Sequence, residues 1–452
     1  MRNSLVSKDL EYIWHPYTQM KDCEDLPPVA IKRGEGAKLY DHEGNFYYDT
    51  ISSWWCNVHG HNHPFIKQAV KEQIDRLEHV LFAGFTHEPA VKLAEKLIRM
   101  APGELTKVFY SDNGSTSVEV ALKMSTQYWA NSGIPDKKKF LSLDLGYHGD
   151  TIGAMSVSGL GLFNRQFEHL FFQGYKAPSP YCYRCPCKKR PDTCGLECLA
   201  KAEAILKKNH NEISGIIIEP LLLGAGGMIV YPVSYLEGIS GLAEKYDVHL
   251  ILDEVATGFG RTGKMFACEH AEGISPDFLC LSKGLTSGYL PLGATLTTGE
   301  IYNAFYGDHS ERKTFYHGHT FTANPVACAA ASASIDLFKK ENTLERAAEI
   351  NSQIAIFLKS FSDCPIAGDT RHTGAVGAIE LVKDRKTKEA FNFEERIGSG
   401  IYKAGLMKNL ILRPLGNILY LFLPLCVKDE ELTDIFEKTA EILRSESKKF
   451  RI

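Results

Sequence analysis

Short apolar runs that alternate with longer stretches of helical pattern constrain the fold of this chain more than any other feature. The runs, each bounded by turn-forming or polar residues, cover residues 108–111, 139–143, 215–219, 248–253 and 278–282. Strands that alternate with helices pair in parallel, because each helix carries the chain back across the sheet. The pattern therefore predicts an α/β fold with a large, doubly wound, mostly parallel sheet and helices on both faces.

The rest of the chain predicts a second, smaller unit. The 452 residues are enough for two or three domains' worth of core. Residues 293–298 could add one more strand to the sheet, and after Asn324-Pro325 the pattern becomes helical and then mixed. We expect a large domain over residues 61–329 and a small α+β domain over residues 330–452, which the N-terminal segment, residues 1–60, joins.

The bulk properties exclude several classes of partner. The formal net charge of −4 gives no reason to expect nucleic acid or an anionic membrane. No apolar run reaches the roughly eighteen residues of a transmembrane helix, and residues 1–16 lack the apolar segment of a secretory signal. We therefore expect a cytoplasmic protein. The mostly scattered cysteines are typical of reduced intracellular chains.

A glycine-rich stretch after one predicted strand looks like a phosphate-binding P-loop. In LILDEVATGFGRTGKMF, residues 250–266, Gly258 and Gly263-Lys264 have the P-loop spacing. A P-loop needs Ser or Thr after the lysine to bind magnesium, and this chain has Met265. The carboxylates of Asp253 and Glu254, which precede the loop, would also repel a polyphosphate. The residues favour a glycine-rich turn over nucleotide binding.

A second glycine-rich loop, SDNGSTSVE at residues 111–119, suits a phosphate better. It leaves a predicted strand and opens a helix expected over residues 115–129, with Thr116 and Glu119 spaced as a capping box. The backbone N–H groups near Gly114 and Ser115, together with the helix dipole, would form an anion site. An ordinary strand-to-helix turn remains an equal alternative on this loop alone.

Lys283 stands at the end of another apolar run and before a glycine. A buried lysine has a lowered pKa and can bond to an aldehyde, although most single lysines simply reach water. Its combination with Asp253, the anion site and the aromatic Tyr147 matches what pyridoxal phosphate requires. The acid keeps the pyridine nitrogen protonated, the lysine carries the aldehyde, the helix takes the phosphate and the aromatic ring covers the cofactor.

Two segments centred on these residues resemble the signature of the class III aminotransferases of fold type I. They are DEVATGFGRTGKMFACEH, residues 253–270, and PDFLCLSKGLTSGYLP, residues 276–291. Further similar segments cover residues 13–20, 52–64, 114–124, 146–157, 218–228, 315–331 and 412–424. The resemblance therefore runs nearly from end to end, and WHPYT (14–18) with SSWW (52–55) indicates one subfamily of the class.

The resemblance implies a role for each matching residue around pyridoxal 5′-phosphate. Lys283 would hold the cofactor covalently and later move a proton, and Asp253 would pair with the pyridine nitrogen. Gly114 and Ser115 would bind the phosphate, and Tyr147 would lie over the ring. The resemblance also implies a homodimer with shared active sites, because Thr320 would reach the phosphate in the other subunit.

The resemblance further implies a substrate pocket. Tyr17, counted with Lys283 and Asp253 as catalytic, would form its wall together with Trp54 and Trp55. Arg413 would take the substrate carboxylate, supported by Arg261 and Asp150. By composition alone the three aromatic residues could instead be core, and Arg413 could be a surface residue.

The implied activity is transfer of an amino group to the 7-keto group of 8-amino-7-oxononanoate in biotin synthesis. Stacked aromatic residues suit the apolar chain of this acceptor, and an arginine suits its carboxylate. The implied donor is S-adenosylmethionine, with lysine as an alternative. Other possibilities are another class III ω-aminotransferase, or a non-catalytic protein that would have lost Lys283 or Asp253, both of which are present.

Some residues depart from the family pattern or suggest a metal. Leu223 stands where relatives usually have glutamine, and His319 replaces a proline found in some members. Five cysteines lie close together in the sequence: Cys182, Cys185, Cys187, Cys194 and Cys198. All except Cys187 have a spacing seen in structural zinc sites. A zinc site, free thiols and a redox-sensitive loop remain as alternatives. The alternating His59, His61 and His63 favour a loop over a metal site, because no acid stands among them.

Overall fold

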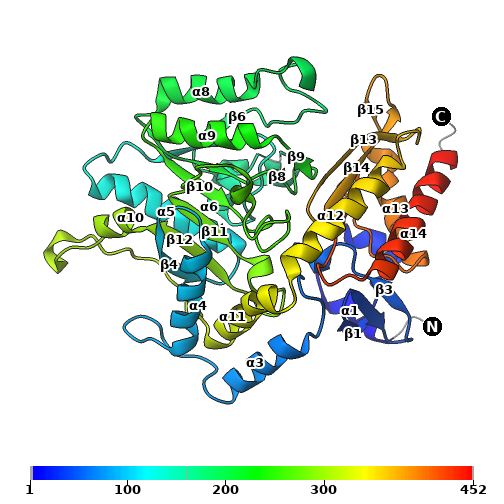
Figure 1. The fold of residues 1–452 in the computed structure, drawn as a ribbon, viewed down its shortest axis with the longest axis horizontal. Helices are drawn as coiled ribbons and strands as arrows, with labels where there is room; N and C mark the ends of the chain where they lie inside the picture. Colours follow the sequence, from blue (N-terminus) through cyan, green and yellow to red (C-terminus); the bar gives the residue numbers. More distant parts are fainter. Residues whose placement is uncertain (1–3, 160, 450–452) are drawn as a thin grey trace.

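A seven-stranded mixed sheet forms the centre of the computed structural model, which describes residues 4–159 and 161–449 (Figure 1). Its spatial order is β4-β12-β11-β10-β7-β5-β6. The strands are β4 (Leu105–Ser111), β5 (Lys139–Leu143), β6 (Tyr175–Ala177), β7 (Ile213–Ile218), β10 (His249–Asp253), β11 (Phe278–Leu281) and β12 (Gly293–Thr298). The predicted α/β class and large, mostly parallel sheet are confirmed.

One strand runs against the others. β12 is antiparallel to both of its neighbours, β11 and β4, whereas β11, β10, β7, β5 and β6 pair in parallel. The connection from β11 to β12, residues 282–292, is too short for a crossover helix, so the chain returns directly beside the strand that it has just left. This connection carries Lys283.

Helices cover both faces of the sheet, and alternate residues of each central strand face different helices. Ile217 and Ile251 belong to one apolar cluster with Val118 of α5, whereas Ile216 and Leu250 belong to another that includes residues of α9. The helices of this part are α3 (Pro64–Ile74), α4 (Glu88–Met100), α5 (Gly114–Asn131), α6 (Ile152–Val157), α7 (Gly161–Asn164), α8 (Glu197–Asn209), α9 (Val233–Lys245), α10 (Gly299–Ala304) and α11 (Pro325–Lys340). Strands buried on both sides explain the nearly continuous apolar runs in the sequence.

The C-terminal part is a smaller α+β unit beside the large sheet (Figure 1). It contains α12 (Thr343–Lys359), β13 (Ala367–Thr373), β14 (Val376–Asp384), β15 (Glu389–Ala390), α13 (Ile397–Met407), β16 (Ile418–Phe422) and α14 (Asp429–Lys449). The N-terminal elements are α1 (Ser4–Tyr12), β1 (Ile31–Glu35), β2 (Lys38–Asp41), β3 (Phe46–Tyr48) and the four-residue turn α2 (Ser52–Trp55). Tyr48 joins the two ends of the chain, because its N–H donates to Asn409 and its carbonyl accepts from Ile411.

Short elements complete the described chain. The hairpin of β8 (Leu222–Leu223) and β9 (Ile229–Val230) follows β7. Single 3-10 turns cover Met20–Glu24, Arg165–Leu170, Pro191–Thr193, Ala267–His270, Lys283–Thr286, His309–Glu311 and Phe393–Glu395. Within residues 4–159 and 161–449, no helix is both long enough and apolar enough to cross a membrane.

The predicted start of α5 was wrong. The N-cap residue is Asn113, whose side chain accepts the N–H of Thr116, and the hydroxyl of Thr116 accepts the N–H of Asn113 in return. The helix therefore begins at Gly114, and Thr116 is its third residue. Glu119 takes no part in the cap, because its carboxylate accepts hydrogen bonds from the start of α6, including the N–H of Gly153 at 2.8 Å. An asparagine at the N-cap satisfies the first turn as well as the expected threonine would.

Candidate active site

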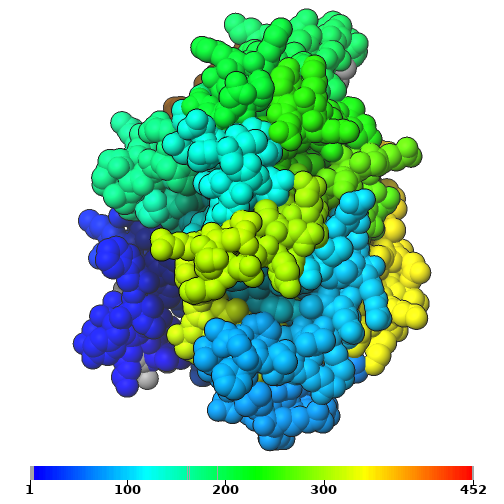
Figure 2. Space-filling view, turned by 90° about the vertical axis from the view of Figure 1, so that its left-hand side faces the viewer, coloured from blue at the N-terminus to red at the C-terminus, as the bar shows by residue number. Residues whose placement is uncertain are grey.

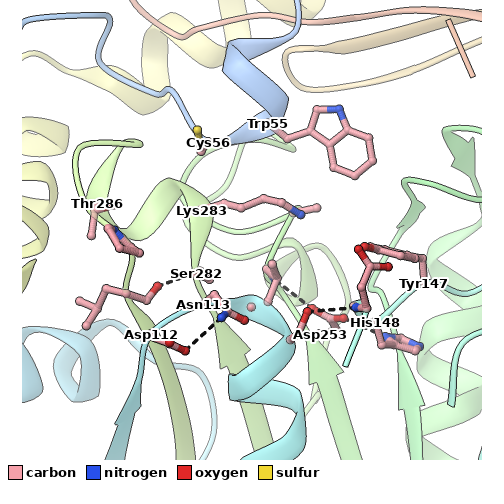
Figure 3. A pocket seen from close by; sticks show the side chains of 18 of the residues that line it. Trp55, Cys56, Asp112, Asn113, Tyr147, His148, Asp253, Ser282, Lys283 and Thr286 are labelled. Carbon is pink, nitrogen blue, oxygen red and sulfur yellow. Dashed lines mark hydrogen bonds and ion pairs between the residues drawn. The ribbon is translucent and has the colours of Figure 1, made fainter. Parts of the chain in front are cut away.

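A cavity of 570 Å³ lies at the carboxyl edge of the large sheet, where ligands bind in folds of this type (Figure 3). Its lining comes from the loops after β4, β5, β7, β10 and β11 and from the N-terminal segment. The residues of the lining include Trp55, Cys56, Asn113, Gly114, Ser115, Tyr147, His148, Asp150, Glu219, Asp253 and Lys283. Residues far apart in sequence therefore meet in one cavity.

Lys283 directly follows β11 and is half-buried, and its amine points into the cavity (Figure 3). Its Nζ lies 4.9 Å from the ring centre of Trp55, which enters from the N-terminal segment on the opposite side (Figure 3). Burial lowers the pKa of the Lys283 amine, although the charges of Asp253 and Glu219 act in the opposite direction. A lowered pKa favours the neutral, nucleophilic amine.

Asp253 ends β10 with both carboxylate oxygens occupied by hydrogen bonds. Oδ1 accepts the N–H of Val255 at 3.1 Å, and Oδ2 accepts Nδ1 of His148 at 2.8 Å. Because a carboxylate only accepts, Nδ1 of His148 carries a proton, and its buried Nε2 finds no partner among the described residues. No motif in the sequence indicated a role for His148, although it follows Tyr147 in a strand-end loop.

Glu219 is a second buried carboxylate in the cavity, and no motif in the sequence indicated a role for it either. Its Oε2 accepts the N–H of Tyr147 and its Oε1 accepts the N–H of Gly224, each at 2.9 Å. Burial, and then the negative charge of Asp253, raise the pKa of Glu219 to about 8. Glu219 therefore ties the loop that carries Tyr147 to the loop that follows β7.

The N-terminus of α5 forms an anion site in the wall of the cavity. Gly114 and Ser115 begin the helix, and their N–H groups lie at the positive end of its dipole. A side chain at position 114 would lie 2.5 Å from Cγ1 of Val255, so glycine is required there. Ser115 is fixed by a hydrogen bond that its Oγ accepts from the N–H of Asp150 at 3.2 Å.

Asp150, on the rim of the cavity, is linked through Tyr17 and Trp54 to Arg413. The hydroxyl of Tyr17 donates to Asp150 at 2.6 Å, and burial together with this carboxylate raises the pKa of Tyr17 to about 12. The edge of Tyr17 faces Trp54 at 5.6 Å, and the guanidinium of Arg413 lies 5.0 Å from the ring centre of Trp54. Tyr17 and Trp54 are 47% and 39% exposed, so they are not core residues, whereas Trp55 is buried with its ring facing Lys283.

Trp54 and Trp55 belong to a turn of left-handed helix. The φ angles of Ser52, Ser53, Trp54 and Trp55 are +51°, +46°, +72° and +75°. Helical hydrogen bonds run from the N–H of Trp55 to Ile51 and from the N–H of Cys56 to Ser52. This conformation costs roughly 1–2 kcal/mol for each non-glycine residue and is rare for consecutive residues. Other contacts must therefore stabilise the turn.

Arg261 lies behind this turn and is not part of the cavity wall. Its buried guanidinium donates to the carbonyls of Leu423 and Asn57 and to the hydroxyl of Ser52. Burial lowers the pKa of Arg261 to about 9. Thr320 is exposed and also lies away from the cavity of its own chain.

The histidines and cysteines considered as metal ligands make other contacts in the structure. Among the described residues, no group of three or more His, Cys, Asp or Glu side chains could hold a metal ion. His59 bonds to the carbonyl of Ser334, and His61 and His63 pair with Asp49 and Glu341. The five clustered cysteines form no disulfide, and among the described residues they do not come together in a group that could hold a metal. Of the family departures, Leu223 is buried in β8, whereas the N–H of His319 bonds to Thr322.

Comparisons with known proteins agree with this geometry. The sequence model of the family "Aminotransferase class-III" matches residues 20–443. An adenosylmethionine-8-amino-7-oxononanoate aminotransferase from Geobacter sulfurreducens is 48% identical over 435 residues, 95% of this chain and 96% of the relative. The enzyme of that name from Methanocaldococcus jannaschii is 44% identical over 456 residues, 98% of each chain.

Solved structures of similar proteins have the same fold. The crystal structure of the Methanocaldococcus jannaschii enzyme has a TM-score of 0.93 at 43% identity and covers 98% of both chains. An omega transaminase from Pseudomonas jessenii, solved in complex with PMP, has a TM-score of 0.94 at 34% identity and covers 99% of both chains.

Proposed function

The chain belongs to the class III aminotransferases, and we propose that it transfers the amino group of S-adenosylmethionine to the 7-keto carbon of 8-amino-7-oxononanoate, a step of biotin synthesis. The observation that carries the proposal is the meeting of Lys283, Asp253 and the N-terminus of α5 in one cavity. The names of the most similar relatives supply the substrates.

The residues of the cavity fit pyridoxal 5′-phosphate. Lys283 would hold the aldehyde carbon, Asp253 would hold the proton on the pyridine nitrogen, and Tyr147 would cover the ring. The N–H groups of Gly114 and Ser115 would bind the phosphate, at the one position where a Cβ would collide with Val255. When bound, this cofactor supplies an electron sink for the cleavage of the Cα–H bond of the substrate.

The chain's own residues prepare this chemistry. Lys283 has a lowered pKa, so its neutral amine can bond to a carbonyl carbon and later take and return a proton at the substrate's Cα. His148 and the N–H of Val255 fix the carboxylate of Asp253 in one orientation. Glu219 holds the backbone of Tyr147, so the covering ring keeps its place.

The rim residues suit a long acceptor with a terminal carboxylate. Trp54, Trp55 and Tyr17 present apolar ring surface to the aliphatic chain of the acceptor. Arg413 and Tyr17 also line a neighbouring cavity of 540 Å³ between residues 15–28 and 396–414. A chain that leaves Lys283 along the aromatic rings would bring its carboxylate to the guanidinium of Arg413.

We also propose that two copies of the chain form a homodimer with shared active sites. Residues 65–100, in blue, and residues 299–325, in yellow-green, both lie on the face shown in Figure 2. Both segments carry exposed large apolar side chains. They are Ile74, Leu81, Phe85, Val91, Tyr302, Tyr306, Tyr316 and Phe321. Clusters of exposed apolar side chains are typical of protein interfaces. Thr320 lies in the same segment and would reach the phosphate site of the partner subunit.

A visible absorption spectrum tests the proposed reaction. The purified protein, supplied with pyridoxal phosphate, should show a protein-bound cofactor band that Lys283→Ala lacks. S-adenosylmethionine should remove this band, and 8-amino-7-oxononanoate should restore it. If lysine alone removes the band, the cofactor site stands and the donor is wrong. If neither donor changes it but other ω-amines do, the chain is an ω-aminotransferase of different specificity.

A further inference from the structure

One buried carboxylate holds the left-handed turn Ser52–Trp55. Asp49 directly follows β3 and is 1% exposed. Its Oδ1 accepts the N–H of Ser53 at 2.8 Å, and its Oδ2 accepts the hydroxyl of Ser53 at 2.7 Å and Nε2 of His61 at 2.9 Å. Two of these three hydrogen bonds come from Ser53, the second residue of the turn.

The turn needs such external contacts because its own sequence does not favour it. Ser-Ser-Trp-Trp contains no glycine, the residue that adopts positive φ without cost. Arg261 binds Ser52, at the start of the turn, and Asn57, two residues after its end. The hydroxyl of Ser52 donates to the carbonyl of Phe422. Asp49 binds the backbone and the hydroxyl of Ser53, the second residue of the turn.

The handedness of the turn decides where both indoles lie. Trp55 stacks on Phe422 at 5.5 Å and 24°, donates from Nε1 to the hydroxyl of Tyr420, and faces Lys283. Trp54, one residue earlier, lies between Tyr17 and Arg413 at the rim. A right-handed or extended Ser53 would turn the following residues away from these positions.

We propose that Asp49 is a positioning residue for substrate specificity. By binding Ser53 it keeps Ser52–Trp55 left-handed, and it thereby keeps Trp55 beside Lys283 and Trp54 beside Arg413. Asp49 lies behind the turn and touches Ser53 and His61, so it acts through the two tryptophans. The identity of the substrate rests on the proposed function, but the placement of the turn does not.

The test compares Asp49→Ala with Asp41→Ala in the cofactor-loaded enzyme. Asp41 is a matched control, because it is also buried and also stabilises a turn: its carboxylate accepts the N–H groups of Glu43 and Asn45 in the hairpin of β2 and β3. Both variants should unfold at lower denaturant concentration than the parent. Only Asp49→Ala should lower kcat/KM for 8-amino-7-oxononanoate, by roughly tenfold to a hundredfold and chiefly through KM.

Two further readouts separate positioning from general stability. The near-ultraviolet circular dichroism of Asp49→Ala should change, because the Trp55–Phe422 stack is displaced, while its visible cofactor band stays. Ser53→Ala, which removes one of the two bonds to Asp49, should shift KM and the spectrum in the same direction by less. Asp49→Asn keeps an acceptor for the N–H of Ser53, so its KM and its spectrum should lie between those of the parent and those of Asp49→Ala.

The proposal would be overturned if Asp49→Ala matched Asp41→Ala in KM and in near-ultraviolet signal. It would be overturned equally if Asp49→Ala did not fold while Ser53→Ala and Asp49→Asn kept the parental KM and spectrum. A parent enzyme that does not accept 8-amino-7-oxononanoate would contradict the proposed function alone, since the circular dichroism comparison still decides whether Asp49 holds the turn.

Discussion

The amine of Lys283 has a lowered pKa and points into the cavity (Figure 3). Lys283→Arg keeps the length and polarity of the side chain, but a guanidinium does not become a neutral nucleophile. We expect turnover to fall by roughly 10²–10⁴-fold and the protein-bound cofactor band to disappear. Steady-state rates and visible spectra measure both effects.

Lys264→Arg is the matched control for this substitution. Lys264 belongs to the glycine-rich turn after β10, and its amine donates to the carbonyl of Glu269 outside the cavity. Its replacement should leave rate and spectrum unchanged. Substantial activity in Lys283→Arg would show that Lys283 is not the residue that bonds to the cofactor.

Single residues at strand ends could be found in the sequence, whereas their buried partners could not. Lys283 and Asp253 each end an apolar run, and the structure places both in the cavity. His148 and Glu219 acquire their positions from partners far away in the chain, so their neighbours in sequence say little. The left-handed Ser52–Trp55 was equally hidden, because its conformation is imposed by contacts such as those of Asp49.

The N-terminus of α5 links the stability of one helix to cofactor binding. Asn113 caps the first turn by accepting the N–H of Thr116 at 3.0 Å, next to the N–H groups that would bind the phosphate. Asn113→Ala should reduce the free energy of unfolding by about 1 kcal/mol and weaken pyridoxal phosphate binding. Chemical denaturation and titration of the apoenzyme with cofactor measure the two effects.

A second N-cap residue provides the control. Thr298 caps α10 by accepting the N–H of Ile301 at 3.2 Å, and it does not line the cavity. Thr298→Ala should lower stability similarly without changing cofactor affinity. If both variants kept parental affinity, the first turn of α5 would not be the phosphate site. The exact start of α5 could not be predicted, because Asn113, Ser115 and Thr116 are all residues that can cap a helix.

The strand β10 contains a histidine that makes the fold sensitive to acid. His249 is buried, its Nδ1 lies 2.8 Å from the hydroxyl of Ser125, and burial lowers its pKa from 6.5 to about 3. Between these two values the unfolded chain binds a proton that the folded chain does not, so the free energy of unfolding decreases as the pH falls.

We expect a loss of up to about 1.4 kcal/mol per pH unit below roughly pH 6.5 from this residue. His249→Asn should make the dependence shallower, as measured by urea unfolding at pH 7, 6 and 5. His59, whose pKa burial also lowers to about 3, contributes in the same direction. Equal slopes for parent and His249→Asn would contradict the assignment.

At the scale of the whole molecule, the texture of the sequence indicates two units but not their boundary. We propose a large domain over residues 61–329, with residues 1–60 and 330–452 in the small domain. The contacts of Tyr48 with Asn409 and Ile411 support the grouping of the two ends. The proposed boundary at residue 330 falls inside α11, which packs on α3 and α4 of the large domain. Because one continuous helix joins the two units, the sequence pattern does not change at their boundary.

The proposed sharing of sites between subunits can be tested by complementation. Thr320→Asp places a carboxylate where Thr320 would meet the partner's phosphate, so its homodimer should bind cofactor poorly. The Lys283→Ala homodimer should be inactive for a different reason. Neither homodimer therefore contains a complete site, and the two homodimers carry different defects.

A mixed dimer of Thr320→Asp with Lys283→Ala, isolated by two different tags, separates the alternatives. If Thr320 serves the partner's site, one site of the mixed dimer combines an intact Lys283 with an intact Thr320, and the other carries both defects. Such a dimer should recover about half of the parental activity, because one of its two symmetric sites is complete. If Thr320 serves its own chain, each site keeps one defect and mixing restores nothing. The steady-state rate of the purified mixed dimer therefore decides between a shared and a self-contained active site.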